Sequence, residues 1–270
     1  MSHSRSRAAE VARHTVAVVA AGRYVNATGV VVRLRDEVEF ARAHTVEYPP
    51  DAAVPHVVPT GKDTRVEVTD ETTLAAARRL VGDGRPVAAL NFASARHPGG
   101  GFLGGARAQE ESLCRASALY ECLRGCRMYP HHAPLRGGFY TNYAVYSPAV
   151  PVFKDDDGRL LDAPYPCAFV TAPAVNVGTI GRDERPRVRG EMAERVEKVL
   201  AVAAGHGHAA VVLGAWGRGV FKNDPGMIAD LFRAALRTRF AGVFEAVVFA
   251  VPGADGENHH AFADRFAGWA

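Results

Sequence analysis

Hydrophobic and polar positions along this chain form a repeated strand and helix pattern from about residue 80 onward. Short runs that are apolar at nearly every position predict buried strands, and longer stretches with apolar residues three or four positions apart predict helices. The predicted strands are Val87–Phe92, Ala144–Tyr146, Ala168–Ala172, Ala209–Leu213 and Ala246–Val251. The predicted helices are Glu110–Arg127, Glu191–Ala204, Pro225–Phe240 and Glu257–Ala267. Strands that are apolar on both faces need helices on both sides, so the pattern predicts a three-layer α/β/α fold.

The first 80 residues follow a less regular pattern, and a proline-rich turn interrupts them. The predicted elements are a helix over 4–22, a strand over Gly29–Leu34, a helix over Glu37–Tyr48, a strand over Arg65–Val68 and a helix from the expected N-cap Asp70 to Val81. No internal repeat or linker marks a domain boundary. We expect residues 1–80 to form an N-terminal extension of helix and strand that packs on a core domain of residues 81–270.

The composition excludes several classes of protein. The 270 residues are 48% hydrophobic and 23% charged, which allows a large core and is unlike a disordered chain. The 32 basic and 29 acidic residues leave a net charge of +3, so no general nucleic-acid-binding field is expected. No apolar run approaches the ~20 residues needed to cross a bilayer. Glu10, Arg13 and His14 interrupt the apolar run that a secretory signal would need, so we expect a cytoplasmic protein without a membrane partner.

Cysteine and acidic residues give little support for a metal site. Cys122 and Cys126 lie four apart on a predicted helix, and His131 and His132 follow, so a zinc site is conceivable. No second pair with metal-ligand spacing accompanies them, and buried reduced thiols are the favoured interpretation. The acidic run KDDD at 154–157 is typical of a solvated hairpin tip. We expect neither a metal nor a cofactor.

Two glycine-rich loops carry the strongest signal for chemistry. Residues 99–111, GGGFLGGARAQEE, lead from a predicted strand into a helix that starts with two glutamates. Residues 214–225, GAWGRGVFKNDP, repeat this order, with Asp224 as the expected N-cap and Pro225 at the first helical position. Ligands of open α/β sheets bind at the carboxyl ends of strands, and glycines let main-chain N–H groups approach a phosphate. The loops therefore predict a diphosphate site, with tight turns that merely need glycine as the alternative. Neither loop fits the GxxxxGK[ST] or GxGxxG fingerprint.

The polar and aromatic residues around these loops each allow two interpretations. Glu110 and Glu111 could stabilise a helix N-terminus through its dipole, or one of them could act as a general acid and base. Neighbouring helical positions point about 100° apart, so we expect one glutamate to shuttle the proton and the other to fix the substrate. Asn91 and Asn176 could bind sugar hydroxyls or cap turns, and Phe221 could stack on a base or pack in the core.

The run GGGFLGGARAQEE is also part of a longer set of motifs. GGG, a seven-residue spacer over Phe102–Ala108 and QEE are followed by VYSPAVPVFKDDDG (145–158), VTAPAVN (170–176) and LGAWGRGVFKNDP (213–225). This combination resembles the bacterial-type poly(ADP-ribose) glycohydrolases, strongly over about residues 80–252. The resemblance implies a macrodomain fold, in which a mixed sheet between helical layers binds ADP-ribose.

The resemblance also implies roles for the matching residues. Glu111 is expected to be the catalytic glutamate and Glu110 its catalytic partner, which binds ribose hydroxyls. The expected substrate-binding residues are Asn91, Gly99, Gly100, Gly101, Gln109, Asn176, Gly217, Arg218, Gly219, Val220 and Phe221. Among them, 99–101 form the catalytic loop, 217–220 the diphosphate-binding loop, and Phe221 packs against the ligand. Arg218 and His97 depart from the residue types common in the family, which affects substrate preference more than catalysis.

The implied reaction is hydrolysis of the ribose–ribose bond of poly(ADP-ribose), which releases ADP-ribose. Glu111 would donate a proton to the leaving oxygen and then activate water. Two alternatives stay open. The same site could remove ADP-ribose from a modified nucleic-acid base or protein side chain, or the domain could bind ADP-ribose without cleaving it. The expected partners are therefore ADP-ribose, its polymer, and an ADP-ribosylated protein or nucleic acid.

Overall fold

A mixed sheet forms the centre of the computed structural model, which describes residues 2–59, 61 and 63–269. Within these ranges the sheet has seven strands in the order β3-β6-β7-β5-β8-β9-β4. Their bounds are β3 (Val46–Tyr48), β4 (Arg65–Thr69), β5 (Val87–Phe92), β6 (Ala144–Lys154), β7 (Leu160–Ala172), β8 (Ala210–Leu213) and β9 (Ala246–Ala250). Strands β7, β5, β8, β9 and β4 are parallel, whereas β6 is antiparallel to both of its neighbours. A separate two-stranded hairpin joins β1 (Arg23–Val25) to β2 (Val31–Arg33).

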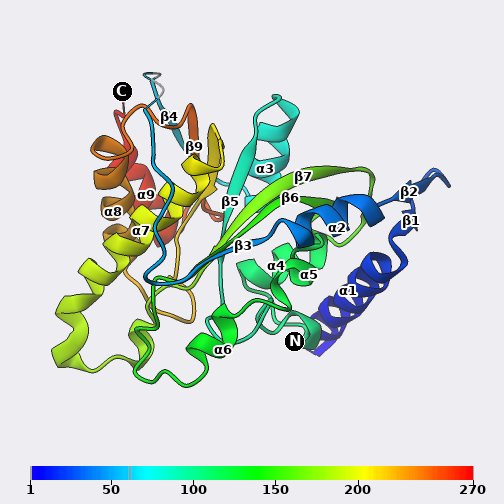
Figure 1. Cartoon of the computed structure of the whole chain (residues 1–270), viewed down its shortest axis with the longest axis horizontal. Coiled ribbons are helices and arrows are strands. Elements are labelled where there is room, and N and C mark those ends of the chain that lie inside the picture. The colour runs from blue at the N-terminus through cyan, green and yellow to red at the C-terminus, as the bar shows by residue number, and fades with distance from the viewer. Residues whose placement is uncertain (1, 60, 62, 270) are drawn as a thin grey trace.

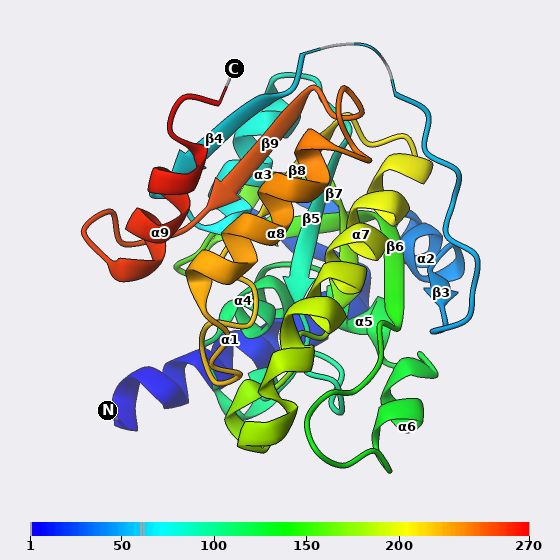
Figure 2. The ribbon, with the colours of Figure 1, turned by 90° about the vertical axis from the view of Figure 1, so that its left-hand side faces the viewer.

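Helices cover both faces of the sheet, as Figure 1 shows, so the three-layer prediction is confirmed. One layer contains α1 (Ser2–Ala21), α2 (Arg35–Ala43), α3 (Thr73–Gly82), α4 (Gln109–Ala116), α5 (Leu119–Leu123) and α6 (Met128–His132). The other contains α7 (Val188–Gly205), α8 (Pro225–Arg237) and α9 (Glu257–Phe266), which lie in front of the sheet in Figure 2. Along β5, Val87 and Ala89 join the first core and Ala88 and Leu90 the second. This alternation explains why the strand is apolar at both faces.

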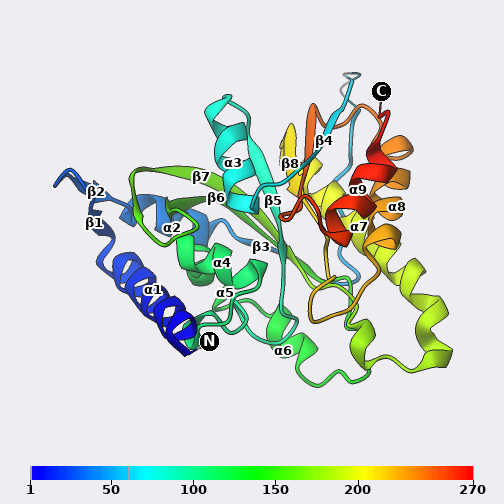
Figure 3. The ribbon, with the colours of Figure 1, turned by 180° about the vertical axis from the view of Figure 1, so that it is seen from behind.

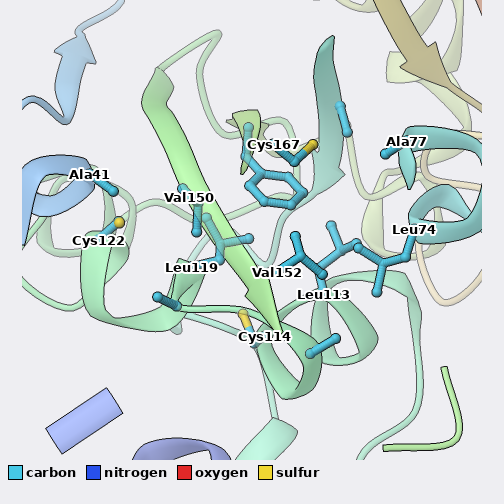
Figure 4. Packing of buried hydrophobic residues seen from close by; sticks show 14 of the residues in the cluster. Ala41, Leu74, Ala77, Leu113, Cys114, Leu119, Cys122, Val150, Val152 and Cys167 are labelled. Carbon is cyan, nitrogen blue, oxygen red and sulfur yellow. The ribbon is translucent and has the colours of Figure 1, made fainter. Parts of the chain in front are cut away.

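The predicted helix over 110–127 is divided in two. Helix α4 ends at Ala116, and Ser117 is extended, with φ −140° and ψ 176°. Ser117 forms a bridge with Val152 of β6, and its hydroxyl donates to the Leu113 carbonyl at 2.7 Å. Figure 4 shows Leu113 beside Val152 in the core. The sheet therefore interrupts a helix that the local pattern predicts as continuous.

Two other local predictions were wrong, and a third was wrong at one residue. The helix expected over 37–48 ends at Ala43, and its last residues form the edge strand β3. Asp70 does not cap α3, because its carboxylate accepts from the Gly253 N–H at 2.6 Å, and Thr72 caps the helix instead. Lys154 is not part of a solvated tip, since its side chain is 1% exposed at the end of β6.

The N-terminal segment contributes both edges of the sheet. Strand β3 pairs with β6 at one edge, and β4 pairs with β9 at the other. The sheet is thus built across the expected boundary at residue 80, and the division into residues 1–80 and 81–270 stays a prediction. Among the helices of the described residues, none combines the length and apolar character that a bilayer crossing requires.

Candidate active site

Three neighbouring parallel strands end at the same edge of the sheet. Strand β5 pairs with β7 on one side and β8 on the other, and Asn91 lies opposite Thr171 in this register. Figure 2 shows the arrow of β5 ending beside α4. The two predicted glycine loops follow β5 and β8, so the fold brings them to one edge, where ligands of parallel sheets bind.

Gln109 fixes the start of α4 to the end of β5. Its Oε1 accepts from the Phe92 N–H at 2.9 Å, and its Nε2 donates to the Leu90 carbonyl at 2.8 Å and to Thr73 Oγ1 at 3.2 Å. Both ends of the amide are therefore occupied within the protein. The structure gives Gln109 a positioning role at this point, whereas its expected role in binding substrate stays a prediction.

Glu110 is buried beside the end of β5. Its Oε2 accepts from the Ser94 N–H at 2.6 Å, and its Oε1 lies 3.4 Å from the Asn91 amide nitrogen. Burial raises the pKa of Glu110 to about 8, against the opposing effect of these hydrogen bonds, and the neighbouring Glu111 carboxylate raises it further. Burial therefore favours the protonated form of Glu110.

Glu111 has one carboxylate oxygen held and one free of protein partners. Oε1 accepts from the Gly101 N–H at 3.0 Å, whereas Oε2 is buried and has no hydrogen-bond partner among the described residues. The side chain is 8% exposed. A buried carboxylate oxygen without a partner is costly in a folded protein, which is typical of a group that meets a ligand.

Bare backbone is needed beside these two acids. Gly100 has φ +58°, and a methyl group there would lie 2.3 Å from Glu111 Oε1 and 3.2 Å from Glu110 Oε2. Gly99 has φ +68°, and a methyl group there would lie 3.1 Å from the Cys114 sulfur. The adjacent glycines thus let the loop lie directly over both carboxylates.

Asn91 connects this cluster to the neighbouring strand. It is fully buried at the end of β5, and its Nδ2 donates to Thr171 Oγ1 at 3.2 Å. Its Oδ1 is buried without a hydrogen-bond partner in the described part of the chain. The structure therefore brings together Asn91, Glu110 and Glu111, as the sequence predicts.

Asn223 shapes the second glycine loop and was missed at the sequence level. It is 1% exposed, and its Nδ2 donates to the Val175 carbonyl at 2.7 Å and to the Gly217 carbonyl at 3.2 Å. Gly217 has φ +75°, and a methyl group there would lie 2.5 Å from Asn223 Nδ2. The predicted cap is confirmed, because Asp224 accepts from the Met227 N–H at 2.6 Å and Pro225 starts α8. In the sequence, the only sign of this role was that Asn223 directly precedes the helix cap Asp224.

The residues between Gly217 and Phe221 point in different directions. Arg218 turns toward α9, where it donates to Glu257 Oε2 at 3.0 Å and to Asn258 Oδ1 at 3.1 Å. Gly219 and Val220 are exposed, and Val220 reaches 81% exposure. The main chain of this loop is therefore accessible, whereas the Arg218 side chain is engaged elsewhere on the protein.

Phe221 and Asn176 lie on neighbouring loops. The Phe221 ring is half-buried, with its centre 6.2 Å from that of Tyr140, a residue that the sequence analysis also missed. A methyl group on Gly178 would lie 3.5 Å from the Val220 carbonyl, which places the segment after Asn176 beside the second loop. Asn176 Oδ1 is buried and has no hydrogen-bond partner among the described residues.

A cavity of about 270 Å³ lies between the starts of α3 and α4 and the end of β9, and Ala215 is its lining residue from the second loop. Its lining includes Phe92, Gln109, Ala215, Val251 and Asn258. The four cysteines are buried and free, and the described residues contain no group of three or more His, Cys, Asp or Glu placed to hold a metal.

Comparisons with known proteins agree on one family. The model described as microbial-type PARG, catalytic domain, matches residues 12–155. The crystal structure of a poly(ADP-ribose) glycohydrolase from Thermomonospora curvata is 46% identical, with a TM-score of 0.92 over 97% of this chain and 100% of that chain. The same enzyme bound to the inhibitor ADP-HPD has the same identity and coverage, with a TM-score of 0.90. A poly(ADP-ribose) glycohydrolase from Deinococcus radiodurans in complex with ADP-ribose is 40% identical, with a TM-score of 0.79 over 88% of this chain and 100% of that chain. No curated protein sequence matches the chain.

Proposed function

This chain belongs to the microbial-type poly(ADP-ribose) glycohydrolases, and we propose that Glu111 is the general acid and base of its reaction. The protein is a glycosidase-type hydrolase that acts on poly(ADP-ribose). The observation that carries the assignment of Glu111 is its buried Oε2, which has no partner in the described chain while Oε1 is held by Gly101. An oxygen in this state can give a proton to the leaving group, and later take one from water, without first breaking a hydrogen bond to the protein.

The two glutamates divide the work in this proposal. Glu111 enters protonated and donates its proton to the leaving 2′-oxygen as the bond between this oxygen and the anomeric carbon breaks, which leaves an oxocarbenium ion. The ionised Glu111 then takes a proton from water, whose oxygen bonds to the same carbon, and Glu111 is protonated again. Burial raises the pKa of Glu110 to about 8, which favours its protonated form, so Glu110 adds no negative charge to oppose the ionisation of Glu111 in the first step. Its position beside Asn91 suits hydrogen bonding to ribose hydroxyls.

The neighbouring loops indicate where the remaining parts of the ligand bind. Main-chain N–H groups of Gly217, Gly219 and Val220 bind the diphosphate, because glycines leave the amides accessible. The Gly99–Gly101 backbone lies beside the ligand, while the Gly100 and Gly101 N–H groups donate to the His97 carbonyl and to Glu111 Oε1. The 270 Å³ cavity beside Ala215 can take the nucleoside end, while Phe221 packs against the ligand and Asn176 binds a hydroxyl. The Arg218 side chain is bound to Glu257 and Asn258 and its N–H donates to the Ala215 carbonyl at 3.2 Å, so Arg218 shapes the loop rather than donating to the diphosphate.

Conservative substitution of the glutamates tests this proposal. Glu111→Gln should bind ADP-ribose with wild-type affinity, measured by calorimetry, and release no ADP-ribose from purified polymer, measured by chromatography. The exposed Glu37→Gln on α2 is the control and should leave both properties unchanged. Turnover by Glu111→Gln at the wild-type rate would remove Glu111 from the mechanism.

The same experiment addresses the alternative substrates. We include an ADP-ribosylated protein and an ADP-ribosylated nucleic acid as partners of this site, because both carry a terminal ADP-ribose, as the polymer does. Release from either, with the polymer left intact, would favour the alternative hydrolase; binding without release from any of them would favour a binding module. A cytoplasmic location is part of the proposal and is supported by the four buried free thiols.

A further inference from the structure

The first turn of α1 contacts the first glycine-rich loop, which leads over residues 99–111 into α4. Arg5 Nε donates to the Gly104 carbonyl at 3.0 Å, and Arg107 Nη1 donates to Ser4 Oγ at 2.7 Å. Figure 3 shows α1 running alongside α4 on one side of the sheet. Two segments about 100 residues apart in the sequence therefore meet at the loop that covers Glu110 and Glu111.

The approach between α1 and the loop is close enough to require glycine. Gly105 has φ +80°, and a methyl group there would lie 2.2 Å from the Arg5 carbonyl oxygen and 3.0 Å from Arg5 Cγ. These are contacts with the backbone and the inner part of a side chain, which cannot simply rotate away. The loop backbone thus rests directly on the backbone of α1.

A buried lysine anchors the middle of α1. Lys154 Nζ donates to Thr15 Oγ1 at 2.7 Å and to the Val11 carbonyl at 3.1 Å. Thr15 in turn donates to the carbonyl of Arg115, which lies on α4 with the two glutamates. Burial lowers the pKa of Lys154 to about 8. Helix α1 is therefore bonded to both the glycine loop and the helix that carries the acids.

Backbone hydrogen bonds connect this contact to Glu111. The N–H groups of Gly104 and Ala106 both donate to the Gly101 carbonyl, at 3.0 and 3.1 Å. Gly101 uses its own N–H to hold Glu111 Oε1 at 3.0 Å. Any shift of Gly104 or Gly105 is thus transmitted through one tight turn to the group that orients the catalytic carboxylate.

We propose that α1 sets the position of the glycine loop against Glu111, so that Arg5 and Gly105 are positioning residues for the hydrolysis. The inference rests on the proposed function of Glu111. It assigns α1 a role in turnover rather than only in stability. Loosening this contact should slow the chemical step, because the carboxylate loses its alignment, while ADP-ribose keeps most of its contacts with the second loop.

Point variants of the full-length chain test the inference. Arg5→Ala removes one hydrogen bond and should lower the single-turnover rate of ADP-ribose release by about twofold to tenfold. Arg5→Lys should restore part of the rate. Gly105→Ala should lower it by roughly tenfold or more, since the loop must move away from α1. The affinity for ADP-ribose should stay within about twofold of the wild type in all three.

Matched controls separate positioning from stability. Arg13→Ala removes an exposed arginine of α1, and Gly84→Ala places alanine at φ +78° where no atom lies within 4 Å. Both should keep the wild-type rate. The inference would be overturned if Arg5→Ala and Gly105→Ala had the same rates as these controls, or rates reduced only in proportion to the unfolded fraction. In that case the proposed function would still stand, provided that the wild type is active and Glu111→Gln is inactive. A wild-type protein without activity on the polymer would overturn both.

Discussion

Gly100→Ala places one methyl group against the Glu111 carboxylate, the proposed general acid and base. The ideal Cβ would lie 2.3 Å from Glu111 Oε1 and 3.1 Å from its Cδ. Contacts of this kind ordinarily begin at 3.4 Å, so the oxygen must retreat from 2.3 to 3.4 Å, a shift of about 1.1 Å. Glu111 cannot make this shift and keep its 3.0 Å hydrogen bond to the Gly101 N–H unchanged.

The expected loss follows from this displacement. A misplacement of about 1 Å at a reacting group costs roughly 100-fold in rate, so turnover of the polymer should fall by about that factor. Alanine at φ +58° also adds backbone strain. That strain is worth roughly 1–2 kcal/mol and should lower the melting temperature by roughly 2–8 °C. The folded state should otherwise persist, because the methyl group meets side-chain oxygens rather than the core.

Single-turnover release of ADP-ribose, measured beside thermal unfolding, separates these two effects. Gly29→Ala is the control, because Gly29 has φ +83° with no atom within 4 Å. It should show the strain without the loss of rate. If Gly100→Ala retained turnover within about threefold of the wild type, Glu111 would not need its observed position, and the assignment of the catalytic geometry would be refuted.

Glu110 and His208 should give stability opposite dependences on pH. Burial holds the pKa of Glu110 near 8, above its ordinary 4.5, so the folded state binds the extra proton and stability falls as pH rises between these values. In urea unfolding, the free energy of unfolding of Glu110→Gln relative to that of the wild type should therefore rise by at most about 5 kcal/mol as pH increases to 8. A difference between the two proteins that does not change with pH would contradict this. Burial lowers the pKa of His208 from 6.5 to about 4, so stability is lost as pH falls from 6.5 to 4. His208→Gln should therefore make the melting temperature depend less on pH over this range. An unchanged pH profile would show that His208 does not cause the loss of stability in acid. Asn223→Ala removes the 3.2 Å bond to the Gly217 carbonyl and should weaken ADP-ribose binding about tenfold in calorimetry, whereas equal affinity would remove Asn223 from the support of the loop.

Local patterns in the sequence predict the central elements and the loops of the site. Strand β5 has the predicted bounds, because residues 87–90 alternate between the two apolar cores. Asp224 and Pro225 start α8 as predicted, because capping depends on the next three residues only. The glycine loops were also predictable from the sequence, since a positive φ or a close backbone approach restricts a position to glycine.

Long-range contacts decided the features that these patterns do not contain. Ser117 ends α4 because it pairs with Val152 on a distant strand, and residues 46–48 leave a helical pattern to pair with β6. Lys154 is buried because α1 supplies acceptors for its ammonium group from more than 100 residues away. The Arg218 side chain turns from the second glycine loop to Glu257, which lies about 40 residues away in the sequence, for the same kind of reason.

The sequence by itself determined which residue types stand beside one another: glycine loops, adjacent acids and strands apolar on both faces. Only the tertiary structure decided that burial raises the pKa of Glu110, which oxygen of Glu111 stays free and which helix contacts the first glycine loop. The physical reason is that periodicity and capping act over a few residues, whereas burial, pKa and close approach depend on atoms that folding brings together from distant parts of the chain.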